Sequence, residues 1–159
     1  MKGQLAEMMG RHAQDGRLDW IGLRPERRGA VLTPDHAEIT ADGLAGDHAS
    51  ADKRAVTLIQ AEHIPVIATL AGLGGVEPTD LRRNLMISGI NLYALRKANL
   101  RIGDAILHVT GPCPPCSRME EVLGPGGYNA MRGHGGWYAS VVTPGHIKLG
   151  APVTVIAAG

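Results

Sequence analysis

The chain has 159 residues, the length of one ordinary domain, and we predict a single domain over residues 1–159. Its 16 basic and 15 acidic side chains nearly cancel, so the charge predicts no nucleic-acid partner and no attraction to an anionic membrane. No run approaches the roughly 18 apolar residues of a membrane-spanning helix, and the first residues lack the apolar segment of a signal peptide, so we expect a cytoplasmic protein.

The first half of the chain predicts short elements separated by turns. They are a helix over 4–13, a turn-rich arm to residue 28, two β segments over 29–33 and 37–43, a strand over 54–60 and a helix over 61–72. The two β segments are joined by Pro34 and Asp35, which predicts a hairpin. Pro65 is tolerated in the first turn of the second helix, and Gly72 ends it.

The second half is richer in β patterns. They fall at residues 85–89, 101–111, 137–143, 146–150 and 152–157, with one short helix predicted over 115–123. The strands outnumber the helices and lie too close together in sequence for repeated β-α-β crossovers. We therefore predict a mainly β protein, an antiparallel or mixed barrel with a few short helices attached.

Both cysteines of the chain lie in the segment "GPCPPCSRMEE". In a reducing cytosol, Cys113 and Cys116 are more often free thiols, a redox pair or metal ligands than a structural disulfide. They are equally consistent with two small buried residues beside a turn stiffened by prolines. A zinc site is disfavoured because no second Cys or His pair follows at the spacing of a zinc finger.

Cys116 has the more reactive position of the two. Pro115 precedes it and "SRMEEVLG" follows, which predicts a helix that begins at or near Cys116. Free backbone N–H groups at a helix start and the nearby cation Arg118 favour a thiolate. A thiolate attacks sulfur or carbon, carries a persulfide or binds a soft metal.

Four sequence blocks resemble the MOSC domain, the module named after the C-terminal part of molybdenum cofactor sulfurase. In chain order they are "DKRAVTLIQAEH", "DLRRNLMISGINL", "LRIGDAILHVTGPCPPCSRMEE" and "RGHGGWYASVVTPGHIKLGAPVTV". The resemblance covers about residues 43–156. Residues 1–28 are predicted to form an N-terminal helix and arm, and "GRLDWIGLRP" in this arm resembles the arm of small stand-alone bacterial members.

The resemblance implies a MOSC-type β-barrel that serves the molybdenum cofactor, a pterin. By its place in the family's Pro-Cys block, Cys116 is the thiol that would ligate molybdenum or carry sulfur, and Cys113 would be an auxiliary thiol. The chain is too short to include a pyridoxal phosphate domain, so sulfur would come from a partner such as a cysteine desulfurase. In a reductase of N-hydroxylated compounds, the partner would instead be a redox protein.

Three further groups of residues are candidates for cofactor binding. They are Arg82, Arg83 and Asn84 in "DLRRN", Asp47 and His48 in "GLAGDHAS", and Arg132, His134 and Trp137 in "MRGHGGWYAS". Two guanidinium groups can clamp a phosphate, and a tryptophan in a glycine-rich loop can stack on a flat ring. Each group also has a structural interpretation: surface arginines, an aspartate that holds a loop, and a tryptophan that anchors one.

The arginine pair, Asn84 and the loop from Arg132 to Trp137 are predicted to converge on the cleft that holds Cys116. The sequence favours a sulfur carrier (a possible sulfurtransferase) or the cofactor-binding part of a molybdenum reductase. Two alternatives remain open: a non-catalytic module that binds a phosphopterin or nucleotide, and a thiol oxidoreductase that uses both cysteines.

Overall fold

The computed structural model describes residues 3–48 and 54–156. Its main body is a closed barrel of seven strands in the order β1-β10-β6-β7-β8-β4-β5. In chain order these are β1 (Gly16–Ile21), β4 (Val56–Gln60), β5 (Leu85–Ser88), β6 (Asn99–Ile102), β7 (Ala105–Pro112), β8 (Trp137–Thr143) and β10 (Pro152–Ile156). The pairs are antiparallel except β4 with β5, so the barrel is mixed, and the prediction of a mainly β barrel is confirmed.

A small second sheet of three strands stands beside the barrel. It has the order β3-β2-β9, formed by β2 (His36–Thr40), β3 (Gly43–Leu44) and β9 (Gly145–Lys148). Ala37 and Ile39 of β2 alternate with exposed residues and pack with Ile147 of β9 against the main core. This alternation is typical of a strand with one buried face.

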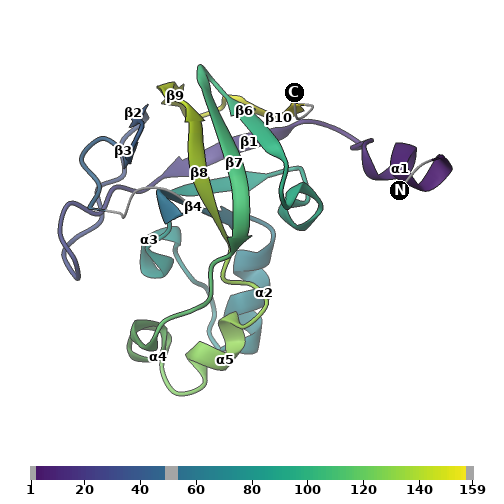
Figure 1. The fold of residues 1–159 in the computed structure, drawn as a ribbon. Helices are drawn as coiled ribbons and strands as arrows, with labels where there is room; N and C mark the ends of the chain where they lie inside the picture. Colours follow the sequence, from purple (N-terminus) through teal and green to yellow (C-terminus); the bar gives the residue numbers. More distant parts are fainter. Residues whose placement is uncertain (1–2, 49–53, 157–159) are drawn as a thin grey trace.

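Short helices complete the fold. They are α1 (Gln4–Met9), α2 (His63–Leu70), α3 (Pro78–Leu81), the 3-10 helix η2 (Leu92–Leu95), α4 (Ser117–Leu123) and α5 (Gly127–Met131). Helices α2, α4 and α5 lie together at one end of the barrel, whereas α1 projects from it (Figure 1). Ile59 of β4 packs with Ile64, Met119 and Met131 of these helices, while Leu58 points into the barrel core. Strand β4 is therefore buried on both faces, and its polar residues Thr57 and Gln60 are buried as well.

Two predicted β elements are wrong. Residues 29–33 form no strand; Leu32 makes one isolated bridge to Leu23 and stays 53% exposed. Strand β2 instead pairs with β3 and β9, because Ala37 and Ile39 reach the core only from that position. The single strand predicted over 101–111 is a hairpin, in which Gly103 turns the chain with a positive φ of 56°.

In the part of the chain that the structure describes, no helix is long and apolar enough to cross a membrane.

Gly136 lies where the start of β8 packs closely against β4. Its φ is 95°, and a methyl group added to it would overlap the carbonyl oxygen of Leu58. Gly133 has a similar φ of 84° but open space around it. We expect Gly133→Ala to cost about 1–2 kcal/mol of unfolding free energy, from backbone conformation alone. Gly136→Ala should cost a further 1–3 kcal/mol, roughly, from overpacking. Urea unfolding measures both, and equal losses would contradict the close approach.

Candidate functional site

The two cysteines line different cavities. Cys116 lines one, of about 220 Å³, and Cys113 lines the other, of about 470 Å³. The two cavities have no lining residue in common, and Pro114 and Pro115 between the cysteines face the Cys113 cavity. The two thiols, three positions apart in sequence, thus open to different surroundings.

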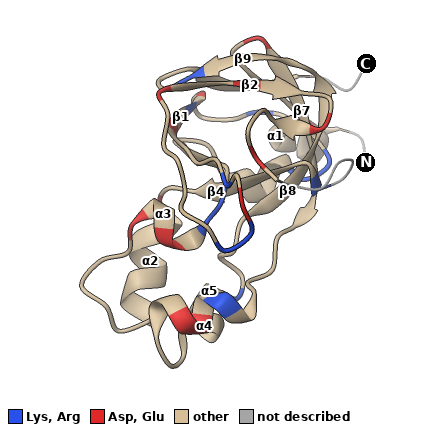
Figure 2. Cartoon of the chain, turned by 90° about the vertical axis from the view of Figure 1, so that its left-hand side faces the viewer, with Lys and Arg blue, Asp and Glu red and all other residues tan. Residues whose placement is uncertain are grey.

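Six arginines surround the Cys116 cavity. They are Arg24, Arg27, Arg28, Arg82, Arg83 and Arg118, with His48 also in the lining. They come from the arm after β1, the turn after α3 and the first turn of α4. Figure 2 shows Lys and Arg segments gathered near β4 and α3, where the barrel meets the helices. Cys116 is exposed there as the N-cap residue of α4, and its side chain makes no capping hydrogen bond.

The charge of these arginines is only partly neutralised. Arg83 is 7% exposed, and its guanidinium donates to the carbonyl oxygens of Gly135 (2.7 Å), Leu81 (3.3 Å) and Pro114 (3.4 Å). Among residues 3–48 and 54–156, no carboxylate forms an ion pair with Arg83 or Arg118. Buried cations without a counterion are costly, so this cavity suits an anion.

Two further observations concern the arginines around the Cys116 cavity. Burial, followed by the neighbouring Arg118 and Arg24, lowers the pKa of Arg82, whereas Asp47 and Cys116 raise it. The Nε atom of Arg118 is buried and has no hydrogen-bond partner among the described residues. An oxyanion beside Cys116 would relieve both conditions, because it would neutralise charge and accept from a free donor.

Asp47 holds Arg24 in place. Its carboxylate is 1% exposed and accepts from Arg24 Nε at 3.1 Å and Nη2 at 3.0 Å. It also accepts from the Arg24 backbone N–H at 2.7 Å. The His48 ring and backbone N–H both contact the Arg24 carbonyl oxygen. The structure thus gives Asp47 a positioning role and brings His48 to the rim; residues 49 and 50 of the same loop lie outside the described residues.

Asn84 is fully buried, and both polar atoms of its side chain form hydrogen bonds with other residues of the protein. Its side-chain oxygen accepts from the Thr57 backbone N–H at 3.0 Å and from the Thr57 hydroxyl at 3.2 Å. Its side-chain nitrogen donates to the Gly22 carbonyl oxygen at 3.0 Å. Asn84 lines neither of these cavities and instead ties β5 to β4 and to the end of β1.

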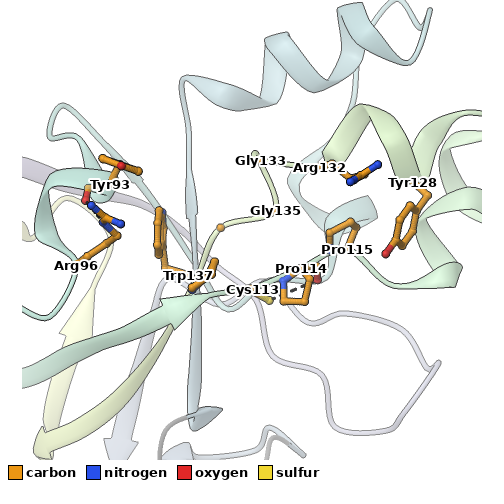
Figure 3. A pocket seen from close by; sticks show the side chains of 12 residues that line it. Tyr93, Arg96, Cys113, Pro114, Pro115, Tyr128, Arg132, Gly133, Gly135 and Trp137 are labelled. Carbon is orange, nitrogen blue, oxygen red and sulfur yellow. Dashed lines mark hydrogen bonds between the residues drawn. The ribbon is translucent and has the colours of Figure 1, made fainter.

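The glycine-rich loop lines the other cavity. Arg132 and Trp137 border the Cys113 cavity together with Tyr93, Arg96 and Tyr128 (Figure 3). His134 turns to His63 of α2, with the two Nδ1 atoms 3.4 Å apart. The predicted single cleft is therefore divided: Arg82, Arg83 and His48 join Cys116, whereas Arg132 and Trp137 join Cys113. Arg83 connects the two, because it bonds Gly135 and Pro114 of the second cavity.

The sequence analysis missed several residues of both cavities. Arg24, Arg27 and Arg28 lie in "RPERR", a cluster of cations that signals an anion site once it is folded beside Cys116. Tyr93, Arg96 and Tyr128 carry no local signal, since only the barrel brings η2 and α5 to the same cavity. No group of three or more His, Cys, Asp or Glu side chains converges within the described residues.

The structure is thus a closed β-barrel with one exposed thiol among arginines. A family model of the MOSC domain matches residues 45–154, and the chain belongs to that family, which is associated with the molybdenum cofactor. No match was found among curated proteins.

Solved structures share the fold. The YuaD protein from Bacillus subtilis superposes with a TM-score of 0.77 at 17% identity, covering 88% of this chain and 94% of that one. YiiM from Escherichia coli gives 0.71 at 22% identity, covering 90% and 71%. YiiM from Geobacillus stearothermophilus gives 0.72 at 18% identity, covering 89% and 75%. At these identities the likeness establishes the barrel fold.

The burial of the two thiols predicts different reactivity. Cys113 is only 4% exposed, whereas Cys116 is exposed and therefore accessible to a reagent in solution. We expect Cys113→Ser, which retains Cys116, to react with 5,5′-dithiobis(2-nitrobenzoate) at least about tenfold faster than Cys116→Ser. Absorbance measures both rates in native protein, and both variants should react equally fast in denaturant. A faster Cys113 in the native state would contradict this assignment.

The His63–His134 pair predicts a pH effect on stability. Burial, followed by the nearby His134, lowers the pKa of His63, while Glu62 opposes this. The unfolded chain therefore binds the proton more tightly, so this contribution to stability is present above about pH 6.5 and is lost as the pH falls through the folded pKa. We expect His63→Gln to lose less unfolding free energy than wild type between pH 7 and 5. The loss of unfolding free energy in His134→Gln should lie between those of wild type and His63→Gln, because the burial of His63 remains. Urea unfolding at each pH tests this order.

Proposed function

We propose that this protein binds the molybdenum cofactor at the Cys116 cavity, with the Cys116 thiolate as the protein ligand to the metal. The observation that carries the proposal is the one exposed thiol among six arginines from separate segments of the chain. A thiolate is a soft ligand suited to such a metal, and guanidinium groups suit the phosphate of the pterin. When bound, the cofactor would supply the redox chemistry.

The residues of the cavity fit this group. The unpartnered Arg118 Nε and the buried Arg83 offer positive charge and a free donor for an anion. At about 220 Å³ the cavity is smaller than the roughly 300–1,000 Å³ usual for drug-sized ligands. It therefore suits the compact anionic end of the cofactor, and the exposed Arg27 and Arg28 would lie at its mouth.

The chain's own residues would act as a rigid cradle. Asp47 and Asn84 fix Arg24, and three carbonyl oxygens fix Arg83, so the guanidinium groups need little reordering when an anion arrives. Cys116 is exposed beside them, so its sulfur would be accessible to a soft metal. A partner with a redox centre would deliver electrons if the protein is the cofactor-binding part of a reductase of N-hydroxylated compounds.

A sulfur-carrier role is the second candidate, favoured by the exposure of Cys116. In that step the Cys116 thiolate attacks the outer sulfur of a persulfide on a donor such as a cysteine desulfurase. The new S–S bond forms at Cys116, the donor S–S bond breaks, and the donor leaves as a thiolate. Cys116 then carries the persulfide, with no net oxidation. A dithiol oxidoreductase receives less support, because Cys113 and Cys116 open to different cavities.

Elemental analysis with intact mass spectrometry tests the proposal. Protein expressed with molybdate and purified without oxygen should contain molybdenum and pterin, because the thiolate and arginines retain them. Cys116→Ser should lose at least about 90% of both, a tenfold loss expected when a direct ligand is removed. Cys113→Ser should keep most of them. An added sulfur atom on Cys116 without molybdenum would support the sulfur carrier, and protein with neither would overturn both roles.

A further inference from the structure

We propose that the Cys113 cavity is a second ligand site, separate from the Cys116 cavity, and that it accepts a flat aromatic anion. The proposal rests on the geometry of this cavity and not on molybdenum chemistry. Its volume of about 470 Å³ lies within the range of small-molecule sites.

The lining has aromatic rings where a flat ligand would stack. Tyr93 and Trp137 meet edge to face, with ring centroids 6.0 Å apart and planes at 71°. Such a corner offers one ring face and one ring edge to a third ring. Tyr93 is 57% exposed and Tyr128 is 40% exposed, so both rings are available to a ligand.

The charges in the lining select an anion. Among the described residues of the lining, Arg96 and Arg132 are the only charged side chains, and none is Asp or Glu. Figure 3 shows Arg96 and Tyr93 on one side of the cavity and Arg132 and Tyr128 on the other, with Trp137 and Cys113 between them. A ring bound between the two sides would thus have one arginine on each side of it. Arg96 also lies over the Tyr93 ring at 4.0 Å, which holds that tyrosine in place.

The walls of the cavity are held in place before any ligand binds. The Cys113 backbone N–H donates to the Gly136 carbonyl oxygen at 2.9 Å, and Arg83 Nε donates to Gly135 at 2.7 Å. The Glu120 carboxylate accepts the backbone N–H groups of Tyr128 (3.0 Å) and Gly126 (3.1 Å), which lower its pKa. These bonds fix both walls, so a ligand would meet a largely preformed site.

The floor and one end of the cavity add to its selectivity. The thiol of Cys113 is 4% exposed and lies between apolar prolines, where a soft sulfur packs well against a ring. A neighbouring cavity of about 780 Å³ shares Tyr93, Arg96 and Pro112 with this one. Together the two provide room for substituents on the aromatic ring.

Isothermal titration calorimetry with naphthalene-2-sulfonate tests this site. We expect saturable binding of one molecule per chain, and at least about tenfold weaker binding of the neutral naphthalene-2-sulfonamide, because charged hydrogen bonds are the stronger ones. Arg96→Gln combined with Arg132→Gln should weaken the sulfonate at least about tenfold and the sulfonamide much less, because only the sulfonate loses charged hydrogen bonds. Tyr93→Leu, an exposed change, should weaken both probes.

Arg27→Gln combined with Arg28→Gln is the matched control, since it removes two exposed arginines from the other cavity. It should leave sulfonate binding unchanged and reduce molybdenum retention. The double variant at Arg96 and Arg132 should weaken sulfonate binding and leave molybdenum retention unchanged. This crossed design separates failure of the second site from failure of the proposed function. Absence of saturable binding, equal affinity for both probes, or loss of binding in the control pair would overturn the proposal.

Discussion

The buried network around Asn84 is the interaction on which the rest of the site depends. The side-chain oxygen of Asn84 is shared by Thr57 of β4 and Arg24 of the arm that follows β1, and its side-chain nitrogen reaches Gly22. A fully buried amide is tolerated only when its donors and acceptor are bonded, so these three segments must keep one arrangement. That arrangement carries Arg24 to the cavity of Cys116, where it lies with Arg82 and Arg83.

The stiffness of the proline-rich segment keeps the two thiols apart. A chain that runs Cys-Pro-Pro-Cys is stiff, because each proline fixes its own φ and restricts the residue before it. Cys113 follows the end of β7, and its backbone N–H donates a hydrogen bond to the carbonyl oxygen of Gly136. Cys116 instead stands at the start of α4. One thiol is thus part of the barrel mouth, and the other belongs to the helical cluster. This separation allows two cavities of different chemistry within one short segment.

The two cavities differ in what they would require of a ligand. Around Cys116 the cations outnumber the carboxylates, Arg83 is buried, and Asp47 forms an ion pair with Arg24. The free energy of such a site falls when an anion enters. Around Cys113 the lining is mostly apolar and aromatic, so stacking and burial of ring surface would dominate and the two exposed arginines would select for charge. Arg83 is the side chain that contacts both.

The sequence by itself determined the strands with strong alternating or unbroken apolar patterns, the helix that begins beside Cys116, and the residue types of an anion site in "DLRRN". Those features are local, since burial pattern, proline and glycine act within a few residues. Tertiary structure alone decided that β2 pairs with β9, more than a hundred residues later, and that "RPERR" faces Cys116 while Trp137 faces Cys113. Burial against the main core sets the β2–β9 pairing of the small sheet, and neighbouring residues carry no record of which distant strand will bury them.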